Sequence, residues 1–370
     1  MSALLKLREL FGLRQRDSVG YARDPEARAE HWSEAEIEDE LARQIAAGFP
    51  VGLAHCRRWP MIERAIKRAG SAPGPPTIQA DAGELASFRD PDKVEPGLLR
   101  LAREGRIRLF FHLPYLFNLW IPFDPSQIRW KGETASVPLA RAQVEYLNAF
   151  SAGLSDEVGA ELGFVVHCGY PRMPGETKNG AYLPAGESAG AEKEELARRF
   201  SQNLCWLFDP FIGALSRRGA RAKILLENMP AQAAGATSDF RGCAALVSGL
   251  DRERYGLCWD SAHSWASGEE LSPADIAAAP VGLAHMNGGP PTLRFGCGLD
   301  LHGYSALGAS IERGTAYPWL ADGRLSALPM VFQRAHYSAM LKDSAWLARE
   351  RGLGEPGQNL RDGCSDQVGA

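Results

Sequence analysis

The chain has 370 residues, of which 45% are hydrophobic and 23% charged, a balance typical of a globular protein with a large core. Its formal net charge is −4, so no overall basic field attracts nucleic acid or an anionic membrane, and any affinity for phosphate must come from a local site. No apolar run reaches the length of a membrane-spanning helix. The seven cysteines form no CxxC pair, which is typical of reduced thiols. We therefore expect an intracellular, cytoplasmic protein that is not secreted.

Residues 1–48 are predicted to form an N-terminal helical extension. Within it, residues 1–16 are a short basic amphipathic stretch, whose neighbouring acidic residues favour a terminal helix over a transit peptide. Ser33 and Glu36 have the spacing of a capping box, which predicts a helix that begins there and ends at Gly48. We expect this helix to plug the bottom of the barrel that the following segments predict.

Short apolar or β-branched runs recur along the rest of the chain, and longer segments with helical spacing lie between them. The runs are apolar throughout, as in parallel strands buried on both faces. They lie at residues 49–55, 76–81, 107–113, 161–167, 222–228, 254–260, 280–286 and 328–333. Helical spacing is found at residues 58–69, 94–104, 137–160, 192–218, 239–253, 272–279 and 336–352. This series predicts an α/β fold, a closed (β/α)8 TIM barrel over residues 49–352, with a doubly wound open sheet as the alternative.

Two long connections interrupt the alternation of strands and helices. Residues 168–191, after the fourth predicted strand, and residues 287–327, after the seventh, are rich in glycine and proline. Long connections in compact domains are usually functional or disordered, and in a barrel both would lie at the face where active sites form. Residues 353–370 are predicted to be a disordered tail.

Polar side chains stand at or just beyond the carboxyl ends of the predicted strands. In a barrel these ends converge on one mouth. Six of the eight histidines of the chain belong to this set. Its members are His55, Asp81, His112, His167, Glu227, Asp260, His263, His285, Asp300, His302 and Gln333. Each residue alone has an ordinary explanation, such as a helix cap for Asp260, but the whole set at one mouth indicates a metal centre.

The donor atoms of this set suit transition metals, because imidazole nitrogens and carboxylate oxygens are the ligands that Zn²⁺, Mn²⁺ and Fe²⁺ use. Asp260 and His263 span a strand end and the turn after it, so both side chains can face the mouth. Asp300 and His302 would share one face of an extended segment. The donors outnumber those of one tetrahedral ion, which predicts two or three metal ions.

Six short motifs occur along the chain in a fixed order. They are Phe111-His112-Leu113-Pro114-Tyr115-Leu116-Phe117-Asn118-Leu119, Val166-His167-Cys168-Gly169, Leu226-Glu227-Asn228, Asp260-Ser261-Ala262-His263, His285-Met286-Asn287 and Asp300-Leu301-His302. The set resembles the endonuclease IV family of apurinic/apyrimidinic endonucleases, within the xylose-isomerase-like barrels, over about residues 49–350. The resemblance implies a (β/α)8 enzyme with zinc ions that cuts the DNA backbone 5′ to an abasic site.

The resemblance also implies roles for individual residues. It assigns His112 and His167 to a first zinc, which Glu227 bridges to a second, and it assigns Asp260 and His285 to that second zinc. A hydroxide that bridges the metals would be the nucleophile, because zinc lowers the pKa of bound water to about 7. Glu227 would thus serve both metal binding and catalysis.

A third zinc and the DNA contacts follow from the same resemblance. His263, Asp300 and His302 would hold the third zinc. The partner would be damaged double-stranded DNA, and we expect the protein to act as a monomer, with Mn²⁺ or Fe²⁺ as substitutes for zinc. The candidate DNA contacts are Tyr115, Asn118 and Arg89.

The last predicted strand departs from the family pattern. Where the family ends its ligand set with a glutamate, residues 331–334 read VFQR. Gln333 takes the place of that ligand and catalytic group, and its amide oxygen can approach a metal but brings no negative charge. We therefore expect weaker binding at the second metal and slower chemistry. Residues 82–89 also lack the Gln/Arg-rich sequence with which the family contacts DNA.

These observations favour a zinc-dependent apurinic/apyrimidinic endonuclease, and two alternatives stay open. A sugar isomerase or epimerase on the same barrel would need one metal and would have no use for His112, His167 and residues 300–302. A divergent member that binds metal or DNA with little turnover would be consistent with the neutral Gln333.

Overall fold

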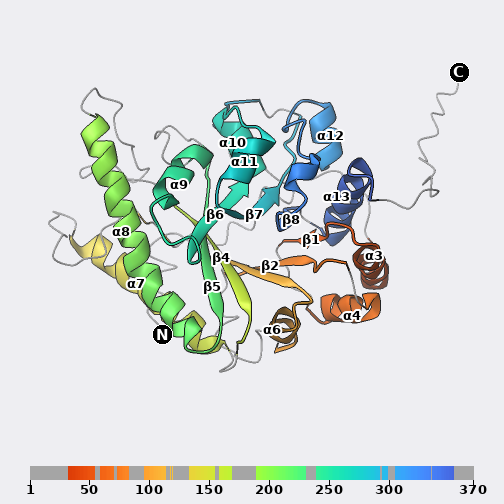
Figure 1. Cartoon of the computed structure of the whole chain (residues 1–370), viewed down its shortest axis with the longest axis horizontal. Helices are drawn as coiled ribbons and strands as arrows, with labels where there is room; N and C mark the ends of the chain where they lie inside the picture. Colours follow the sequence, from red (N-terminus) through yellow and green to blue (C-terminus); the bar gives the residue numbers. More distant parts are fainter. Residues whose placement is uncertain are drawn as a thin grey trace, which may run out of the picture.

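Eight parallel strands form a closed barrel in sequence order (Figure 1). The strands are β1 Gly52–Leu53, β2 Thr77–Asp81, β3 Arg108–His112, β4 Glu161–His167, β5 Arg221–Glu227, β6 Tyr255–Asp260, β7 Val281–Met286 and β8 Met330–Phe332. β1 pairs with both β2 and β8, so the sheet closes on itself. The predicted (β/α)8 barrel is therefore confirmed, and the open sheet is excluded. Every strand overlaps one of the predicted runs.

The computed structural model describes most of the barrel and its outer layer. The described residues are 32–54, 59–70, 73–82, 96–113, 117, 119, 133–154, 158–168, 189–230, 239–291, 294–298, 305–334 and 336–353. Within these ranges, no helix combines the length and the hydrophobicity needed to cross a membrane. The cysteines that fall within them, such as Cys168 and Cys258, are free.

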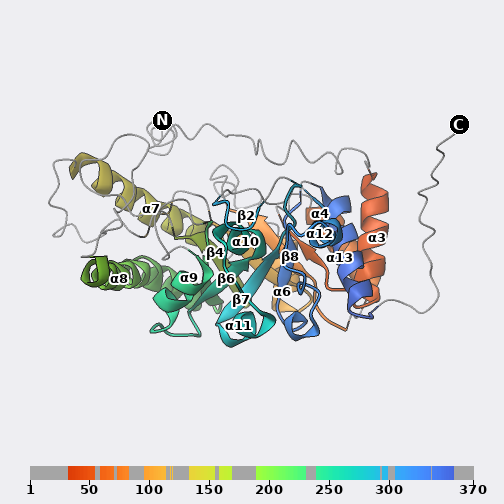
Figure 2. The same cartoon turned by 90° about the horizontal axis from the view of Figure 1, so that it is seen from above.

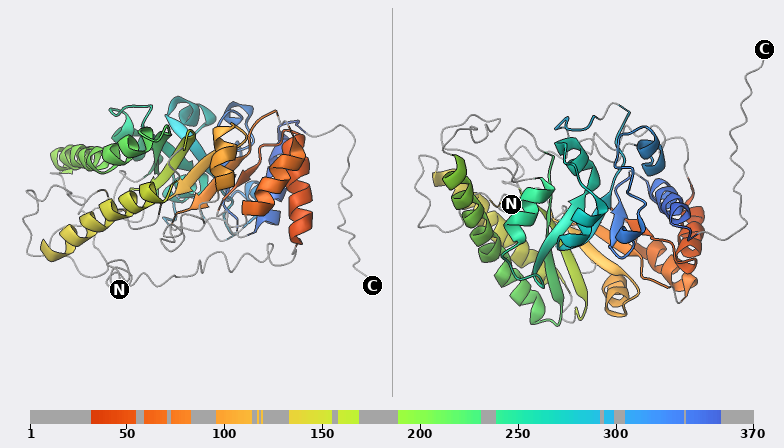
Figure 3. Two further views of the ribbon diagram at one scale, coloured as in Figure 1. Left: turned by 90° about the horizontal axis from the view of Figure 1, so that it is seen from below. Right: turned by 45° about the horizontal axis from the view of Figure 1, so that its top comes forward.

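Helices surround the strands, with α7 and α8 on one side and α3, α4 and α13 on the other (Figures 1 and 2). The helices are α3 Glu34–Ala46, α4 Trp59–Ala69, α6 Pro96–Arg103, α7 Glu133–Gly153, α8 Ala189–Ser216, α9 Phe240–Val247, α10 Ser261–Ser267, α11 Pro273–Ala278, α12 Leu307–Glu312, η4 Gly323–Leu325 and α13 Tyr337–Glu350. The long helices α7 and α8 extend beyond the strands (Figure 3). The sequence predicted neither α10 nor the short helices α12 and η4, because single turns leave no clear periodic pattern.

Side chains alternate between the helical layer and the barrel interior. The ring of Phe164 on β4 lies edge-on to Phe150 of α7 and Phe211 of α8, with centroids 5.6 and 5.0 Å apart. Its side chain therefore points outward, and that of His167, three residues later, points inward. Gly163 also faces the interior, where a Cβ atom would collide with the ring of Phe110. Glycine at this position thus leaves room for Phe110 inside the barrel.

Helix α3 begins with the predicted capping box, in which the Ser33 hydroxyl accepts a hydrogen bond from the third N–H of the helix. The expectation that it plugs the barrel is wrong. It lies on the outside of the molecule, against α4 and α13 (Figures 1 and 2). Arg64 of α4 pairs with its Glu38 at 2.7 Å, and its Gln44 donates to the Leu341 carbonyl of α13 at 2.8 Å. The apolar stripe of α3 is buried by two neighbouring helices rather than by strand ends.

Several predictions concern residues outside the described ranges. They are the N-terminal segment 1–16, the tail from residue 354, most of the connection 168–191, and the site residues His55, Arg89, Tyr115, Asn118, Asp300 and His302. The division into an extension 1–48, a barrel 49–352 and a tail 353–370 also stays a prediction.

Candidate metal centre

The carboxylate of Glu227, at the end of β5, lies inside a buried group of imidazoles at the carboxyl end of the strands. Its Oε2 atom lies 3.1 Å from His112 Nε2 and 2.9 Å from His167 Nε2. Its Oε1 atom lies 3.1 Å from His285 Nδ1 and 3.7 Å from His263 Nδ1. One carboxylate therefore faces two separate pairs of imidazoles, one pair at each oxygen.

The register of the parallel strands explains why residues so distant in sequence meet here. Side chains at paired positions of neighbouring parallel strands point to the same face of the sheet. Residues near the ends of the strands are therefore brought to one level inside the barrel. The paired positions are Asp81 with His112, His167 with Glu227, and Asp260 with His285.

Asp260 serves both the local helix and the centre, because its two oxygens have different partners. Oδ1 accepts a hydrogen bond from the backbone N–H of His263 at 2.8 Å and thereby caps α10. Oδ2 accepts from Asn287 Nδ2 at 2.6 Å and lies 3.7 Å from His285 Nδ1. The helix begins directly after the strand, so His263 is turned back toward Glu227. The spacing of Asp260 and His263 thus does bring both to one mouth, as the sequence predicted.

The ionisable side chains at the centre shift one another's pKa values. Burial alone would raise the pKa of Glu227, but His167, His285 and a hydrogen bond from His112 hold this pKa well below its usual range. Burial lowers the pKa of His167. Burial also acts to lower the pKa of His285, but Cys258 and Glu227 outweigh it and raise this pKa well above its ordinary value. The pKa values of His167 and His285, on the two sides of Glu227, are therefore shifted in opposite directions.

Three overlapping groups of side chains could each hold a metal ion, since the donor atoms in each lie within 4.8 Å of one another. The groups are His112 with His167 and Glu227, Glu227 with Asp260 and His263, and Glu227 with Cys258 and His285. Imidazole and carboxylate donors in buried positions fit a transition metal such as zinc. Glu227 belongs to all three groups, which makes it the residue that connects them.

Cys258 is a neighbour of the centre that the sequence analysis did not name. It lies two residues before Asp260 on the same strand, so both side chains share one face, and that alternation was a usable signal. Burial raises the pKa of its thiol to about 12. A metal ion removes the proton of a thiol that it binds, so the sulfur of Cys258 can join Glu227 and His285 in holding an ion.

Gln333 is connected to the centre through Asn287. It follows β8 directly, its side chain is buried, and its Oε1 atom accepts a hydrogen bond from Asn287 Nδ2 at 2.8 Å. The same Nδ2 atom donates to Asp260 Oδ2. Gln333 thus lies at the edge of the centre, where the neutral amide of Asn287 links it to the candidate ligand Asp260.

Two further buried amides contact the donors, and neither was predicted from the sequence as a site residue. Gln79 of β2 places its Oε1 atom 2.8 Å from His285 Nε2. Asn228 accepts a hydrogen bond from the backbone N–H of Asp260 at 2.7 Å, and its backbone carbonyl lies 2.8 Å from His263 Nδ1. A polar residue two positions before Asp81 in a buried strand was a signal for Gln79, because both share the interior face.

The centre therefore contains His112, His167, Glu227, Asp260, His263, His285 and Gln333. The remaining predicted ligands, Asp300 and His302, lie outside the described residues, as do the predicted DNA contacts Tyr115, Asn118 and Arg89. The third metal and the DNA contacts stay predictions.

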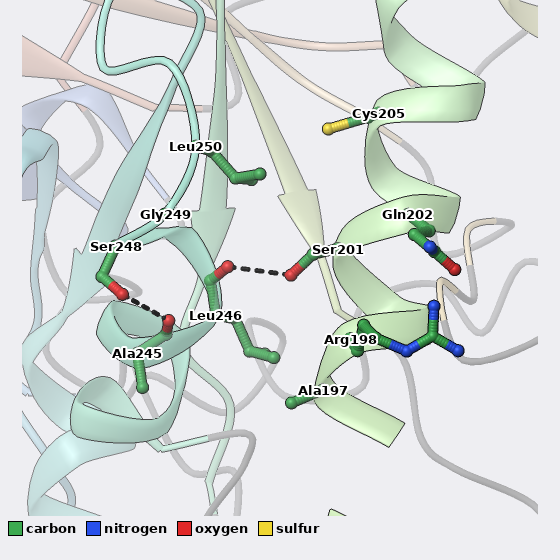
Figure 4. Close-up of a pocket in the computed structure, with 10 residues that line it drawn as sticks. All are labelled: Ala197, Arg198, Ser201, Gln202, Cys205, Ala245, Leu246, Ser248, Gly249 and Leu250. Carbon is green, nitrogen blue, oxygen red and sulfur yellow. Dashed lines mark hydrogen bonds between the residues drawn. The ribbon is translucent and has the colours of Figure 1, made fainter. Parts of the chain in front are cut away.

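A shallow groove between α8 and α9 is a separate feature of the surface (Figure 4). Ser201 Oγ donates to the Leu246 carbonyl across it at 3.0 Å, and Ser248 Oγ donates to the Ala245 carbonyl at 2.9 Å. The residues drawn in Figure 4 include no histidine and no acidic side chain. The groove therefore lacks the imidazole and carboxylate donors of the centre.

No family model matches the chain, but a known protein of similar sequence agrees with the resemblance that the motifs indicated. Over 245 residues the chain is 22% identical to the probable endonuclease 4 of Campylobacter concisus (strain 13826), an alignment that covers 58% of this chain and 83% of that protein. The resemblance to the endonuclease IV family, which the six motifs indicated, is thus confirmed.

Two solved structures are similar in fold. A D-tagatose 3-epimerase-like protein matches with a TM-score of 0.47 and 15% identity, over 82% of this chain and 97% of that one. A xylose isomerase-like TIM barrel protein from Mycobacterium smegmatis, in complex with magnesium, matches with a TM-score of 0.41 and 11% identity, over 83% of this chain and 98% of that one.

Proposed function

We propose that this protein is a zinc-dependent endonuclease that hydrolyses the backbone of damaged double-stranded DNA 5′ to abasic sites. The observation that carries the proposal is the position of Glu227, whose two oxygens face separate imidazole pairs. A carboxylate placed in this way can serve two metal ions at once, as multi-metal phosphodiester hydrolysis requires. The similarity to a probable endonuclease 4 supports the same chemistry.

The donor set divides into three sites, and the first two share Glu227. Bound zinc ions would supply a water molecule of lowered pKa and would neutralise the charge of the phosphodiester oxygens. The residues that would hold them are His112, His167 and Glu227 for the first ion, Glu227, Asp260, His285 and Gln333 for the second, and His263, Asp300 and His302 for the third.

The protein's own contribution is a dry and ordered set of donors. Glu227, Asp260 and His285 are each at most 1% exposed, so bulk water does not screen the charges at the centre. Asp260 uses Oδ1 to cap α10 and keeps Oδ2 directed at the centre. Donors that are fixed before substrate arrives need no reorganisation during the reaction, which is a major source of catalytic power in charged sites.

The neutral side chain of Gln333 lowers the rate of hydrolysis that we expect. A glutamine can orient a ligand and accept hydrogen bonds, but it neither offsets metal charge nor takes up a proton. We therefore expect slower hydrolysis than a glutamate at this position would give. The neutral amide at position 333 also supports a second candidate function, that of a protein that binds metal and abasic DNA with little turnover.

A sugar isomerase or epimerase is a weaker candidate. A single metal bound by carboxylates and one histidine would leave the pair formed by His112 and His167 without a role. Both imidazoles lie within 3.1 Å of one oxygen of Glu227. Their convergence favours a centre with more than one metal.

The decisive experiment is incubation of the purified protein with a labelled duplex that carries one abasic analogue, with zinc content measured on the same sample. We expect incision 5′ to the analogue and at least two zinc ions per chain. Zinc with DNA binding but no incision would support the binding protein instead. A protein without bound zinc after reconstitution would refute the ligand assignment.

A further inference from the structure

We propose that Gln79 is a positioning residue that determines which nitrogen of His285 faces the metal centre. The inference rests on the proposed function, because it concerns a histidine assigned there to the second metal. Gln79 belongs to β2 and His285 to β7, two strands that are separated in the barrel by β8 and β1. Their contact therefore crosses the barrel interior and is not a by-product of strand pairing.

The contact specifies the proton on the imidazole. Gln79 Oε1 lies 2.8 Å from His285 Nε2, and both side chains are fully buried. A carbonyl oxygen only accepts hydrogen bonds, so Nε2 carries the hydrogen. Nδ1 is therefore the nitrogen that can release its proton and bind a metal through the lone pair that this leaves.

The other nitrogen of His285 faces the donors assigned to the second metal. His285 Nδ1 lies 3.1 Å from Glu227 Oε1 and 3.7 Å from Asp260 Oδ2. When Gln79 holds the His285 ring at Nε2, the Nδ1 atom stays directed at both carboxylates. Partners that hold the second nitrogen of a metal-binding histidine fix its tautomer and its orientation, and their loss typically weakens metal binding about 10- to 100-fold.

Stability of the fold does not explain a glutamine at this position. Gln79 Nε2 is buried and has no hydrogen-bond partner among the described residues. An apolar side chain of similar size would fill the interior without burying an unpaired amide nitrogen. Among the described residues, the contact that uses this side chain's polarity is the one between its amide oxygen and His285.

The test compares three variants of the full-length protein. Gln79→Leu removes the acceptor with little change in volume, and Gln79→Glu keeps an acceptor oxygen and adds charge. Gln44→Leu is the matched control, because Gln44 is also fully buried but bonds to the Leu341 carbonyl of α13, away from the centre. The first readout is zinc affinity, measured by competition with a chromophoric chelator.

We expect Gln79→Leu to weaken the affinity for one zinc ion by about 10-fold or more, whereas Gln79→Glu restores or tightens it. Gln44→Leu should lower the melting temperature but leave zinc affinity unchanged within about twofold, since it removes only a structural contact. Zinc affinity that is the same in Gln79→Leu and the unmodified protein would overturn the proposal. Equal weakening in Gln79→Leu and Gln44→Leu would also overturn it, because it would indicate general destabilisation.

The second readout separates this inference from the proposed function. In ¹H–¹⁵N spectra of protein with ¹⁵N-labelled histidine, a hydrogen-bonded Nε2–H proton of His285 should be visible and slow to exchange, and Gln79→Leu should lose it. The resonance is assigned by its absence in His285→Gln. Should the unmodified protein bind no zinc, the proposed function fails and this signal still reports on the contact. Should zinc bind while the signal is missing, the inference about Gln79 fails alone.

Discussion

The two sides of the Glu227 carboxylate are held in different ways. On the side of β3 and β4, the rings of His112 and His167 meet edge to face, with centroids 4.9 Å apart, and both reach Oε2 directly. On the side of β6 to β8, neutral amides hold the donors, with Asn287 between Asp260 and Gln333. Amides orient ligands but add no negative charge. The second side is therefore well ordered and keeps one carboxylate of its own, Asp260, but Gln333 adds none where the resembled family has a glutamate. We expect its metal to bind more weakly than it would with a glutamate at this position.

The largest expected effect comes from Glu227→Gln, which removes the charge that both sides share. We expect the loss of at least two zinc ions and a decrease in incision rate of about 10³-fold or more, because the donor set loses its common ligand. Zinc content by atomic absorption and single-turnover incision measure the two effects. A variant that loses fewer than two zinc ions would show that the two sides bind independently.

A smaller effect is expected for Asn287→Leu, which affects the second side alone. The change removes the donor that Asp260 Oδ2 and Gln333 Oε1 share. We expect one zinc to bind about 10-fold more weakly and the free energy of unfolding to decrease by about 1–3 kcal/mol. Stepwise removal with a chelator, followed by denaturation in urea, measures both. Equal weakening of every zinc would contradict the distinction between the two sides.

Gln333→Glu tests the shortage of charge on the second side. The glutamate keeps an acceptor oxygen for Asn287 and adds a negative charge beside the metal. If the centre is catalytic, we expect incision to accelerate several-fold, by roughly 3- to 10-fold, and the second zinc to bind more tightly. Titration with zinc and steady-state kinetics on an abasic duplex measure the change. Tighter zinc with no gain in rate would mean that this position does not limit the chemistry.

The smallest effect is expected for Arg221→Ala, at the opposite end of the barrel strands. Arg221 begins β5 and pairs with Glu161 of β4 at 3.1 Å, and both side chains are largely exposed. An exposed ion pair contributes at most about 1 kcal/mol, so the melting temperature should change little. Zinc affinity and incision should be the same as in the unmodified protein. This variant is the baseline for the three changes at the centre.

Much of the fold could be predicted because its signals are local. The strands are short apolar runs that can be recognised in the sequence. The polar residues at the ends of these runs, such as His112, Glu227 and His285, can therefore be located in the sequence as well. A closed barrel brings such ends together whatever the details of packing. The order of the motifs also indicated the resemblance to the endonuclease IV family.

Other features depend on contacts between distant segments. The sequence placed Glu227 in the centre but could not show that its two oxygens face different histidine pairs. That arrangement follows from the positions of four strands and of helix α10. It could not show that Gln79 of β2 reaches His285 of β7, because no periodicity relates residues across a barrel interior. The outer position of α3 was likewise decided by α4 and α13. Apolar patterning shows that a face is buried, whereas the partner that buries it is chosen only when the whole chain packs.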